Sequence, residues 1–311
     1  MFGLVVLSFV SSYADQNITS CGAVITTVDN YFLNQSINTS SGTCIEFQAG
    51  ASGSTLNCQG FSINNTGSAS IGVRILSSNF VIEHCNINYF TTNLVTSGNS
   101  NNVNNISSIG VFLGNTLQVT GNSNVIENST FTDGFIILQG NNASFLYNQV
   151  YDLDFFFRSS ISGNDIVANS LFSNVSVYFQ NTLNNTFENI SGFYNVSFTN
   201  SYYNQLKNIS NVEVVFQTMS QNNTFSASSI NNISSFNWSQ TPNFFENNSY
   251  AQDIVNSSGC IIAAQPEVIC DTGSWSVFSP VVVSTSSTAS LFPQNSLFSI
   301  IITLALLFFW S

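Results

Sequence analysis

The strongest constraint in this 311-residue sequence is a repeat with a period near 20 residues. Each unit contains an apolar residue, a variable residue and then, in six of eight units, an asparagine. The leading apolar residues lie 19 to 23 positions apart, in the windows Ile82–His84, Val103–Asn105, Ile126–Asn128, Leu146–Asn148, Val167–Asn169, Phe187–Asn189, Leu206–Asn208 and Phe225–Ala227. Self-similarity at such a period indicates a repeat architecture.

A second apolar segment precedes each window, and polar turns rich in Gly, Asn and Ser separate the two. These segments are Val73–Leu76, Leu94–Val95, Leu117–Val119, Ile136–Leu138, Phe155–Phe157, Val177–Phe179, Val196–Phe198 and Val214–Phe216. Short runs of Val, Ile and Phe between turn residues are typical of strands. Two or three short strands per period predict an all-β fold, a single-stranded right-handed parallel β-helix (solenoid) over residues 15–240.

The asparagine column has a physical reason in such a coil. A sharp turn between strands needs a residue in the left-handed region, which Asn adopts more readily than other non-Gly residues. Stacked Asn side chains can also hydrogen-bond from coil to coil. We therefore predict that the column forms an interior turn ladder. Leucine-rich repeats share the period, but their leucine spacing is absent from this sequence.

Windows such as Ser78–Phe90 and Gly121–Gly134 resemble the repeat of the pectin-lyase-like superfamily of right-handed parallel β-helices. The opening segment, Cys21–Ile63, is similar to the first coils of secreted or cell-surface β-helix proteins of archaeal or metagenomic type. The resemblance covers roughly residues 20–235. It implies a fold, whereas function depends on sites that differ among proteins of one fold.

Six cysteines without a CxxC pair favour an oxidising compartment over a zinc or redox site. If Leu56–Phe61 aligns with Ile82–Ile87, Cys58 and Cys85 occupy neighbouring coils, one column apart, at a separation that suits a disulfide. Two further pairs are then expected, Cys21–Cys44 in the first coil and Cys260–Cys270 in a C-terminal loop.

Both ends of the chain predict export. Residues 1–14 contain the apolar run Phe2–Val10 and end in a small-x-small site at Ser12 and Ala14, as in a secretory signal peptide, although a buried first strand is the alternative. After a cap at 241–280 and a Ser/Thr-rich linker at 281–296, residues 297–311 form a short hydrophobic tail without a basic flank. This pattern predicts a cleaved lipid-anchor (GPI-type) signal; a direct membrane anchor and a buried core helix are the alternatives.

Composition supports a glycosylated surface protein. Only 6% of the residues are charged, and three basic residues face 15 acidic ones, so nucleic-acid binding is excluded. A glycan coat would supply solubility that charge does not. Acceptor sequons are abundant, at Asn17, Asn34, Asn38, Asn64, Asn105, Asn128, Asn142, Asn174, Asn184, Asn189, Asn195, Asn208, Asn222, Asn232, Asn237, Asn247 and Asn256.

The sequence offers one candidate cluster for chemistry. Asp133 and Asp152 follow their window asparagines at similar spacing, so they should lie on adjacent coils near Asp154 and Arg158. The cluster is either a cation or sugar site or a set of solvated turn acids. The latter is favoured because the Asp motifs of β-helix hydrolases and lyases are absent. His84, the one histidine, is assigned to the turn column.

Two further groups of residues have mainly structural explanations. Glu188 and Lys207 fall in one column and are expected to form a structural pair. The runs Phe155–Phe157 and Tyr202–Tyr203 contribute either to the core or to a sugar-stacking surface. No cofactor or metal is expected from the sequence.

The predicted function is that of a secreted, surface-anchored glycoprotein with a structural or adhesive role. Its partners would be the membrane, through the C-terminal tail, and carbohydrate or other surface proteins. The alternative is a carbohydrate-active enzyme of the same fold, a polysaccharide lyase or glycoside hydrolase that uses Asp133, Asp152, Asp154 and Arg158. A ligand-binding surface protein with exposed aromatic residues is a third possibility.

Overall fold

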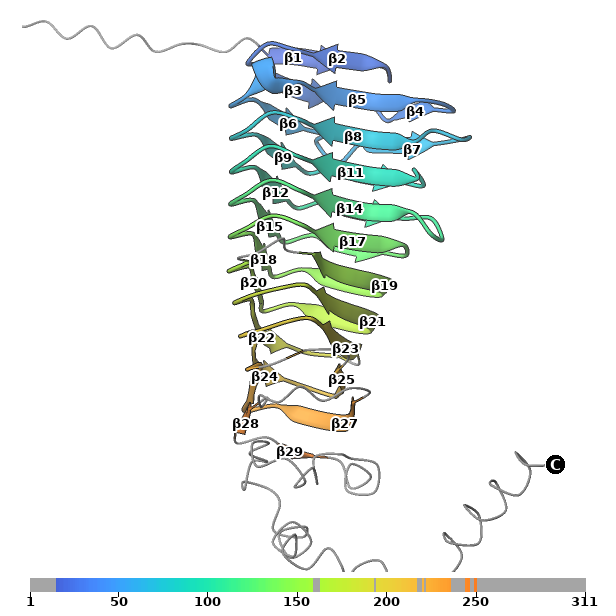
Figure 1. Ribbon diagram of the computed structural model, residues 1–311. Coiled ribbons are helices and arrows are strands. Elements are labelled where there is room, and N and C mark those ends of the chain that lie inside the picture. Colours follow the sequence, from blue (N-terminus) through green and yellow to red (C-terminus); the bar gives the residue numbers. More distant parts are fainter. Residues whose placement is uncertain are drawn as a thin grey trace, which may run out of the picture.

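The computed structural model describes residues 15–158, 163–192, 194–216, 220, 222–235, 244–246 and 249–250. These residues form a parallel β-solenoid, in which coil stacks on coil along one axis (Figure 1). The one helical element described is a short 3-10 turn, η1, at Ala49–Ala51. No helix within the described segments is long and apolar enough to span a membrane. The all-β parallel fold predicted from the repeat is confirmed.

The described strands form three faces of the stack. The first face is a sheet of 12 parallel strands. Its members are β1 (Asp15–Ile18), β3 (Asn30–Leu33), β6 (Thr55–Asn57), β9 (Val81–Glu83), β12 (Asn102–Asn104), β15 (Val125–Glu127), β18 (Ser144–Leu146), β20 (Ile166–Ala168), β22 (Thr186–Ile190), β24 (Gln205–Ile209), β26 (Thr224–Ser226) and β28 (Phe244–Glu246).

The second face consists of shorter strands that also pair in parallel. They are β4 (Ile37–Thr39), β7 (Ser62–Asn65), β10 (Asn86–Asn88), β13 (Ser107–Ile109) and β16 (Thr130–Thr132). The third face contains β2 (Ala23–Ile25), β5 (Thr43–Phe47), β8 (Ile71–Ile75), β11 (Thr92–Thr96), β14 (Asn115–Val119), β17 (Phe135–Leu138), β23 (Tyr194–Thr199), β25 (Val212–Phe216) and β27 (Ser229–Ser235), with β29 (Ser249–Tyr250) paired to β27.

Two ten-residue strands, β19 (Gln149–Arg158) and β21 (Leu171–Gln180), each run through the second and third faces. β28 and β29 continue the strand pairing beyond residue 240, where the repeat was expected to end. The expected C-terminal cap, linker and tail lie outside the described residues except for the short strands β28 and β29, and so does the expected signal peptide.

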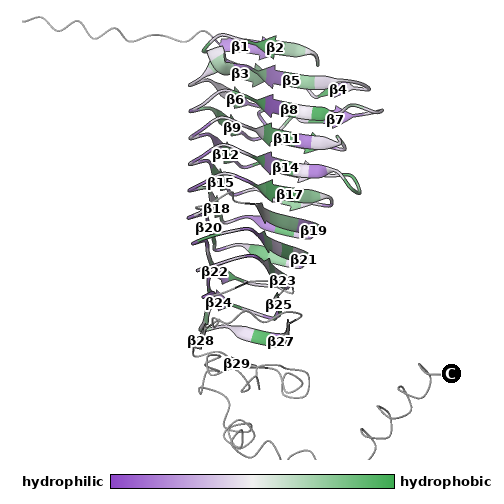
Figure 2. Cartoon of the chain, viewed as in Figure 1, coloured by the Kyte–Doolittle hydropathy of each residue, from purple (hydrophilic) through white to green (hydrophobic). Residues whose placement is uncertain are grey.

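Apolar residues fill the interior because side chains alternate between the two sides of each strand. Figure 2 shows hydrophobic and hydrophilic segments mixed along the stacked strands. On the third face, the predicted apolar column is confirmed from Val73 through Leu94, Leu117 and Ile136 to Phe155, all in register and fully buried. Phenylalanine rings in neighbouring coils contact one another at centroid distances such as 4.8 Å for Phe179 and Phe198.

One predicted window is wrong by a single residue. Ile126 pairs with Phe145, and not with Leu146, so the fourth window is Phe145–Tyr147. Phe145 is fully buried, whereas Leu146 is half-buried and is the register partner of Glu127. Two adjacent apolar residues fit the pattern equally well, and a shift of one residue exchanges the inner and outer faces.

The corner that follows the first face has the predicted left-handed backbone. Asn105, Asn128, Asn169, Asn189 and Asn208 have φ between 51° and 54°. In the corrected fourth window, Tyr147 (φ 57°) occupies the corner position that the prediction gave to Asn148. His84 (φ 54°) lies in the same column.

The predicted interior location of this column is wrong, because its asparagines are exposed. Their side chains still form a coil-to-coil ladder. Asn208 Nδ2 donates to Asn189 Oδ1 at 2.7 Å, and Asn189 Nδ2 donates to Asn169 Oδ1 at 3.1 Å. The left-handed residue turns its own side chain to solvent, and the residue after it points inward.

A second, buried ladder precedes the first face and was not predicted. We call it the inner ladder, and its members are Asn101, Asn124, Asp165, Asn185, Asn204 and Asn223, each at most 1% exposed. The side-chain oxygen of each accepts the backbone N–H of the equivalent residue one coil earlier; for example, the N–H of Asn185 donates to Asn204 Oδ1 at 3.1 Å. The remaining N–H donors in this series belong to Phe80, Asn101, Ala143, Asp165 and Asn204.

Two predicted disulfides are present. Cys21 pairs with Cys44, and Cys58 pairs with Cys85, with Cα–Cα distances of 4.2 and 4.8 Å. The second follows from the predicted register of Leu56 with Ile82. Cys260 and Cys270 lie outside the described residues, so their pairing stays a prediction.

We expect Asn148→Leu to destabilise the solenoid far more than Tyr147→Ser. Asn148 is 1% exposed; its Oδ1 accepts the Ser129 N–H at 2.9 Å, and its Nδ2 donates to the Ile126 carbonyl at 3.0 Å. Leucine would leave both buried partners unpaired, at a cost of about 1–3 kcal/mol each. Tyr147 is 57% exposed. Chemical denaturation of both variants measures the difference, and equal losses of stability would contradict this register.

Candidate functional site

Asp133 and Asp152 occupy one corner, between the second and third faces. The register of Thr132 with Tyr151 places the two aspartates on adjacent coils, and both have left-handed backbones, with φ of 58° and 51°. Asn174 (φ 54°) continues the column on the next coil. Its Nδ2 donates to Asp152 Oδ1 at 2.8 Å, which holds that carboxylate in a defined position.

Asp154 begins the third-face part of β19. Its register partners are Phe135 on one neighbouring coil and Ser176 on the other. Partial burial raises the pKa of the Asp154 carboxyl, and a hydrogen bond with the Ser176 side chain lowers it by a smaller amount. Two carboxyl groups in unlike surroundings thus lie two residues apart on one strand.

A groove of about 410 Å³ gathers Asp152 and Asp154 with apolar residues from a neighbouring loop. The loop before β14 projects sideways from the stack (Figure 1) and carries Phe112 and Leu113, which are 90% and 70% exposed. We call this the Phe112 groove. Its lining residues are Phe112, Leu113, Gly134, Phe135, Asp152, Leu153, Asp154, Asn174 and Ser176.

Leu113 has a φ of 65°, a conformation that a leucine adopts rarely. Gly110 and Gly114 flank the apolar segment, and each lies against backbone atoms that a Cβ would meet. This close packing anchors the loop at both ends and presents its apolar tip to solvent.

The other two residues of the predicted cluster lie elsewhere. Asp133 is the corner neighbour of Asp152 but does not line the groove. Arg158 ends β19 and pairs with Gln180. Four residues of extended strand separate it from Asp154, or about 13 Å along the backbone. The structure therefore brings Asp152 and Asp154 together in a groove and leaves Arg158 further along the same strand.

Sequence reasoning did not find Phe112 and Leu113. The available signal was the pair of glycines around Val111–Leu113, an apolar tripeptide at a corner where the following coil has only Asp133–Gly134. Such a segment interrupts the repeat, so a search for periodic positions passes over it. Asn174 was predicted only as a glycosylation sequon, and Ser176 was not singled out, because both look like ordinary members of the repeat.

The aromatic runs divide between core and surface. Phe155 is fully buried, whereas Phe156 is half-buried on the outer side of the third face. Phe156 stacks on Tyr178 with centroids 4.7 Å apart and contacts Phe135 at 5.8 Å. This outer row begins at the groove, because Phe135 also lines it. Tyr203 is 53% exposed at a different corner.

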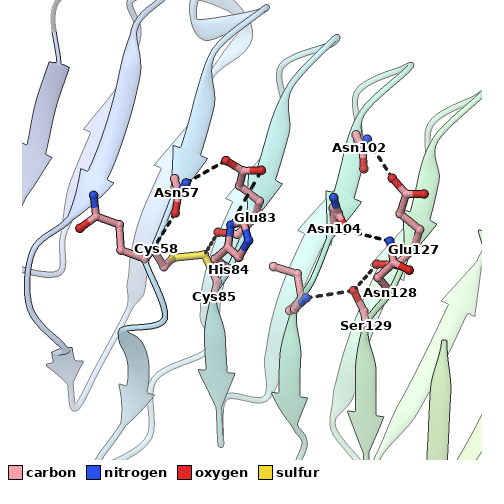
Figure 3. A network of polar contacts seen from close by, with 12 residues as sticks. Asn57, Cys58, Glu83, His84, Cys85, Asn102, Asn104, Glu127, Asn128 and Ser129 are labelled. Carbon is pink, nitrogen blue, oxygen red and sulfur yellow. Dashed lines mark hydrogen bonds and ion pairs between the residues drawn. A yellow bond between two sulfur atoms is a disulfide. The ribbon is translucent and has the colours of Figure 1, made fainter. Parts of the chain in front are cut away.

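A second groove, of about 500 Å³, lies beside His84. Glu83 accepts a hydrogen bond from Asn57 Nδ2 at 2.8 Å, and its other oxygen is 3.9 Å from His84 Nδ1, next to the Cys58–Cys85 disulfide (Figure 3). The lining is mainly polar: Asn57, Gln59, Gly60, His84, Asn86, Asn105, Ile106, Ser107, Asn128 and Thr130. Elsewhere on the first face, Glu188 and Lys207 are register partners, as expected, but the ion pairs of the described residues do not include one between them.

Comparisons with known proteins identify no family for this chain. No protein-family model and no curated protein matches the sequence. Similar solved structures include the catalytic domain of a GH87 α-1,3-glucanase, with 12% identity, a TM-score of 0.40, and coverage of 77% of this chain and 63% of that one. The chain thus spans less than two thirds of the glucanase domain.

Two further solved structures are similar at 10% identity. The surface adhesin PfbA of Streptococcus pneumoniae has a TM-score of 0.38, with 76% of this chain and 79% of the adhesin covered. The A-module of the mannuronan C-5 epimerase AlgE4 of Azotobacter vinelandii has a TM-score of 0.35, with 77% and 85% covered.

Proposed function

We propose that this chain is an extracellular, surface-anchored glycoprotein whose solenoid has an adhesive or structural role and contacts carbohydrate through the Phe112 groove. The observation that carries the proposal is the combination of lining groups in that groove. An exposed phenylalanine ring and a leucine lie beside two carboxylates, an amide and a hydroxyl.

This combination suits a sugar because a pyranose has an apolar C–H face and a rim of hydroxyl groups. Aromatic rings cover the apolar face, while carboxylate, amide and hydroxyl groups exchange hydrogen bonds with the rim. Concave sites with a mainly apolar lining and a few fixed polar groups are the usual form of small-ligand sites. The net charge of −12 and the two groove carboxylates favour a neutral glycan over an anionic one.

The cellular location is supported by the two disulfides, since such bonds persist mainly in oxidising compartments. Several sequon asparagines, among them Asn105, Asn189 and Asn208, are exposed corner residues and are therefore accessible to a glycan. The repeat itself also produces sequons, because a corner Asn is followed by an inward residue and then by Ser or Thr. Sequon number alone therefore does not measure glycosylation.

We expect Phe112→Ala to weaken glycan binding by about tenfold, equivalent to about 1.4 kcal/mol, because the exposed ring supplies the stacking surface. A panel of immobilised neutral and acidic oligosaccharides identifies a binder, and titration calorimetry then compares the variants. Asp152→Asn should also weaken binding.

The matched control is Tyr89→Ala. Tyr89 is 50% exposed, has a positive φ of 68° and follows β10 of the second face, but it does not line the groove. The control should bind like the unmodified protein. Absence of glycan binding, or equal losses in the Phe112 and Tyr89 variants, would count against the proposal.

Mass spectrometry of protein purified from its native surface tests the anchoring and glycosylation. We expect a mature N-terminus after Ala14, a new C-terminus near Ser284–Ser290 with loss of Trp310, and glycans on exposed corner asparagines. A peptide that ends in Trp310–Ser311 would instead indicate a direct membrane anchor.

A second candidate function, glycan cleavage, is favoured by the unlike surroundings of Asp152 and Asp154. A carboxyl group with a raised pKa can serve as a general acid, and a second carboxylate beside it can serve as base or nucleophile. Burial raises the pKa of Asp154, which fits the first role, and Asn174 holds Asp152 in position for the second.

If the protein is such an enzyme, release of reducing-end sugars should fall by at least about 100-fold in Asp154→Asn, because general acid catalysis contributes a factor of this order. Unsaturated products that disappear in Arg158→Ala would indicate lyase chemistry. If purified protein binds a glycan but releases no sugar from it, the adhesive function is retained and the enzymatic one is abandoned.

A further inference from the structure

The inner ladder contains one residue that differs chemically from the others. Asp165 stands where the other five members of the ladder carry an asparagine. It is 1% exposed and lies between Ala143 on the preceding coil and Asn185 on the following one. A carboxyl group in this position is almost completely shielded from solvent, and burial of an unpaired charge is energetically costly.

The hydrogen bonds of Asp165 leave one oxygen without a partner. Its Oδ1 accepts the Ala143 N–H at 2.7 Å, and its own N–H donates to Asn185 Oδ1 at 3.0 Å. These contacts match those of the asparagines in the ladder. Oδ2 is buried and has no hydrogen-bond partner among the described residues.

Two of the five ladder asparagines use their second side-chain atom to bond a carbonyl of the preceding coil. Asn101 Nδ2 donates to the Ser77 carbonyl at 3.0 Å, and Asn223 Nδ2 donates to the Ser201 carbonyl at 2.9 Å. In both cases the carbonyl lies three residues before the ladder position of the preceding coil. Asn204 Nδ2 donates instead to Asn223 Oδ1, and the Nδ2 atoms of Asn124 and Asn185 have no partner among the described residues. For Asp165 the carbonyl equivalent to those of Ser77 and Ser201 is that of Gly140. A neutral carboxylic acid can donate to it, whereas a carboxylate would repel it.

The surroundings favour the neutral form. Burial raises the pKa of Asp165 to about 7, and the Ala143 N–H offsets only part of that rise. On the strands packed against this corner, Glu188 of β22 lies in the outer, half-buried row, and Tyr147 after β18 is exposed. Tyr194 on β23 is buried, and burial raises its pKa well above its usual value, so it stays neutral. Of the described cations, Lys207 is exposed, and Arg74 pairs with Glu46 on distant coils.

We propose that Asp165 completes the inner ladder as a neutral carboxylic acid, and that loss of its proton makes this coil a pH-sensitive weak point of the solenoid. Below neutral pH the acid mimics asparagine, and the series of hydrogen bonds from the Ala143 N–H to Asn223 is continuous. Above it, a buried carboxylate faces backbone oxygen and the ladder is interrupted between Ala143 and Asn185.

The sign of the pH dependence follows from the two states of the chain. In the unfolded chain Asp165 ionises near the ordinary aspartate pKa of 3.8, whereas in the folded protein it keeps its proton up to about pH 7. The unfolded state therefore binds fewer protons between these values, and stability falls as the pH rises through this window. Below pH 3.8 and above pH 7 this group adds no further pH dependence.

The coil that contains Asp165 also supports the Phe112 groove. The coil that starts at Asp165 continues through β20 into β21, which carries Asn174 and Ser176. These two residues hold Asp152 and Asp154 at the Phe112 groove. Local opening of this coil at alkaline pH would therefore loosen one wall of the groove, whatever ligand the groove binds.

The decisive variant is Asp165→Asn, which makes the ladder all-amide at this corner. We expect its Tm to match that of the unmodified protein at pH 4 and to exceed it by roughly 5 °C or more at pH 8. Hydrogen exchange at pH 8 should be slower in residues 163–180 of the variant than in the unmodified protein. A Tm difference that is independent of pH, or a variant less stable at pH 8, overturns the proposal.

The reciprocal variant, Asn204→Asp, tests the same physics at a fully buried ladder position. It should be less stable than the unmodified protein at pH 8 and recover most of its Tm at pH 4. Infrared difference spectra offer a direct readout, because the protonated carboxyl band near neutral pH should lose the contribution of Asp165 in Asp165→Asn. A band of unchanged intensity in the variant, or a pH-independent loss of stability in Asn204→Asp, would also refute the assignment.

Discussion

The solenoid depends on hydrogen bonds that cross its corners inside the stack. Along the strands, backbone N–H groups pair with carbonyls of the neighbouring coil, as in any parallel sheet. At a corner the chain changes direction, and the N–H of the inward residue meets a side-chain oxygen instead. The inner ladder provides this oxygen before the first face. Ser129, Asn148 and Ser170 provide it after the first face, where they accept the N–H groups of Ile106, Ser129 and Asn148.

This requirement explains why the sequence is rich in Asn and Ser and poor in charge. A corner uses one residue that tolerates a left-handed backbone and one short polar residue that fits inside the stack. Asparagine meets both needs, which is why pairs such as Asn184–Asn185 and Asn222–Asn223 begin their coils. A buried side chain that both accepts and donates must be neutral, so amides and hydroxyls satisfy the corners where carboxylates and ammonium groups would incur a desolvation cost.

The sequence was sufficient to predict the fold because period, strand composition and corner chemistry recur in every coil. The disulfide between Cys58 and Cys85 followed from the same register. The one-residue error in the fourth window, which began at Leu146 in the prediction, shows the limit of this reasoning. Phe145 and Leu146 are both apolar, and only packing decides which one points inward. The sequence shows the inner ladder as an Asn two residues before most leading apolar positions. A search for hydrophobic periodicity takes no account of polar residues that recur at a fixed position, so it does not detect this ladder.

The candidate site was less predictable for a related reason. Repetition identifies the residues that hold the coils together, whereas a site consists of departures from repetition. Asp152 stood out because its spacing from the window asparagine is similar to that of Asp133. The Phe112 loop belongs to no column, and its closeness to Asp152 arises from stacking across two coils. Asp165 is the opposite case, a departure hidden within a column. Both departures lie where a solenoid can accept them: Phe112 projects from a corner without disturbing strand pairing, and Asp165 keeps the shape of the asparagine it replaces. The scaffold therefore tolerates chemical variation at its corners while its strands remain fixed. Functional residues can be accommodated at these corners without disturbing the strand pairing.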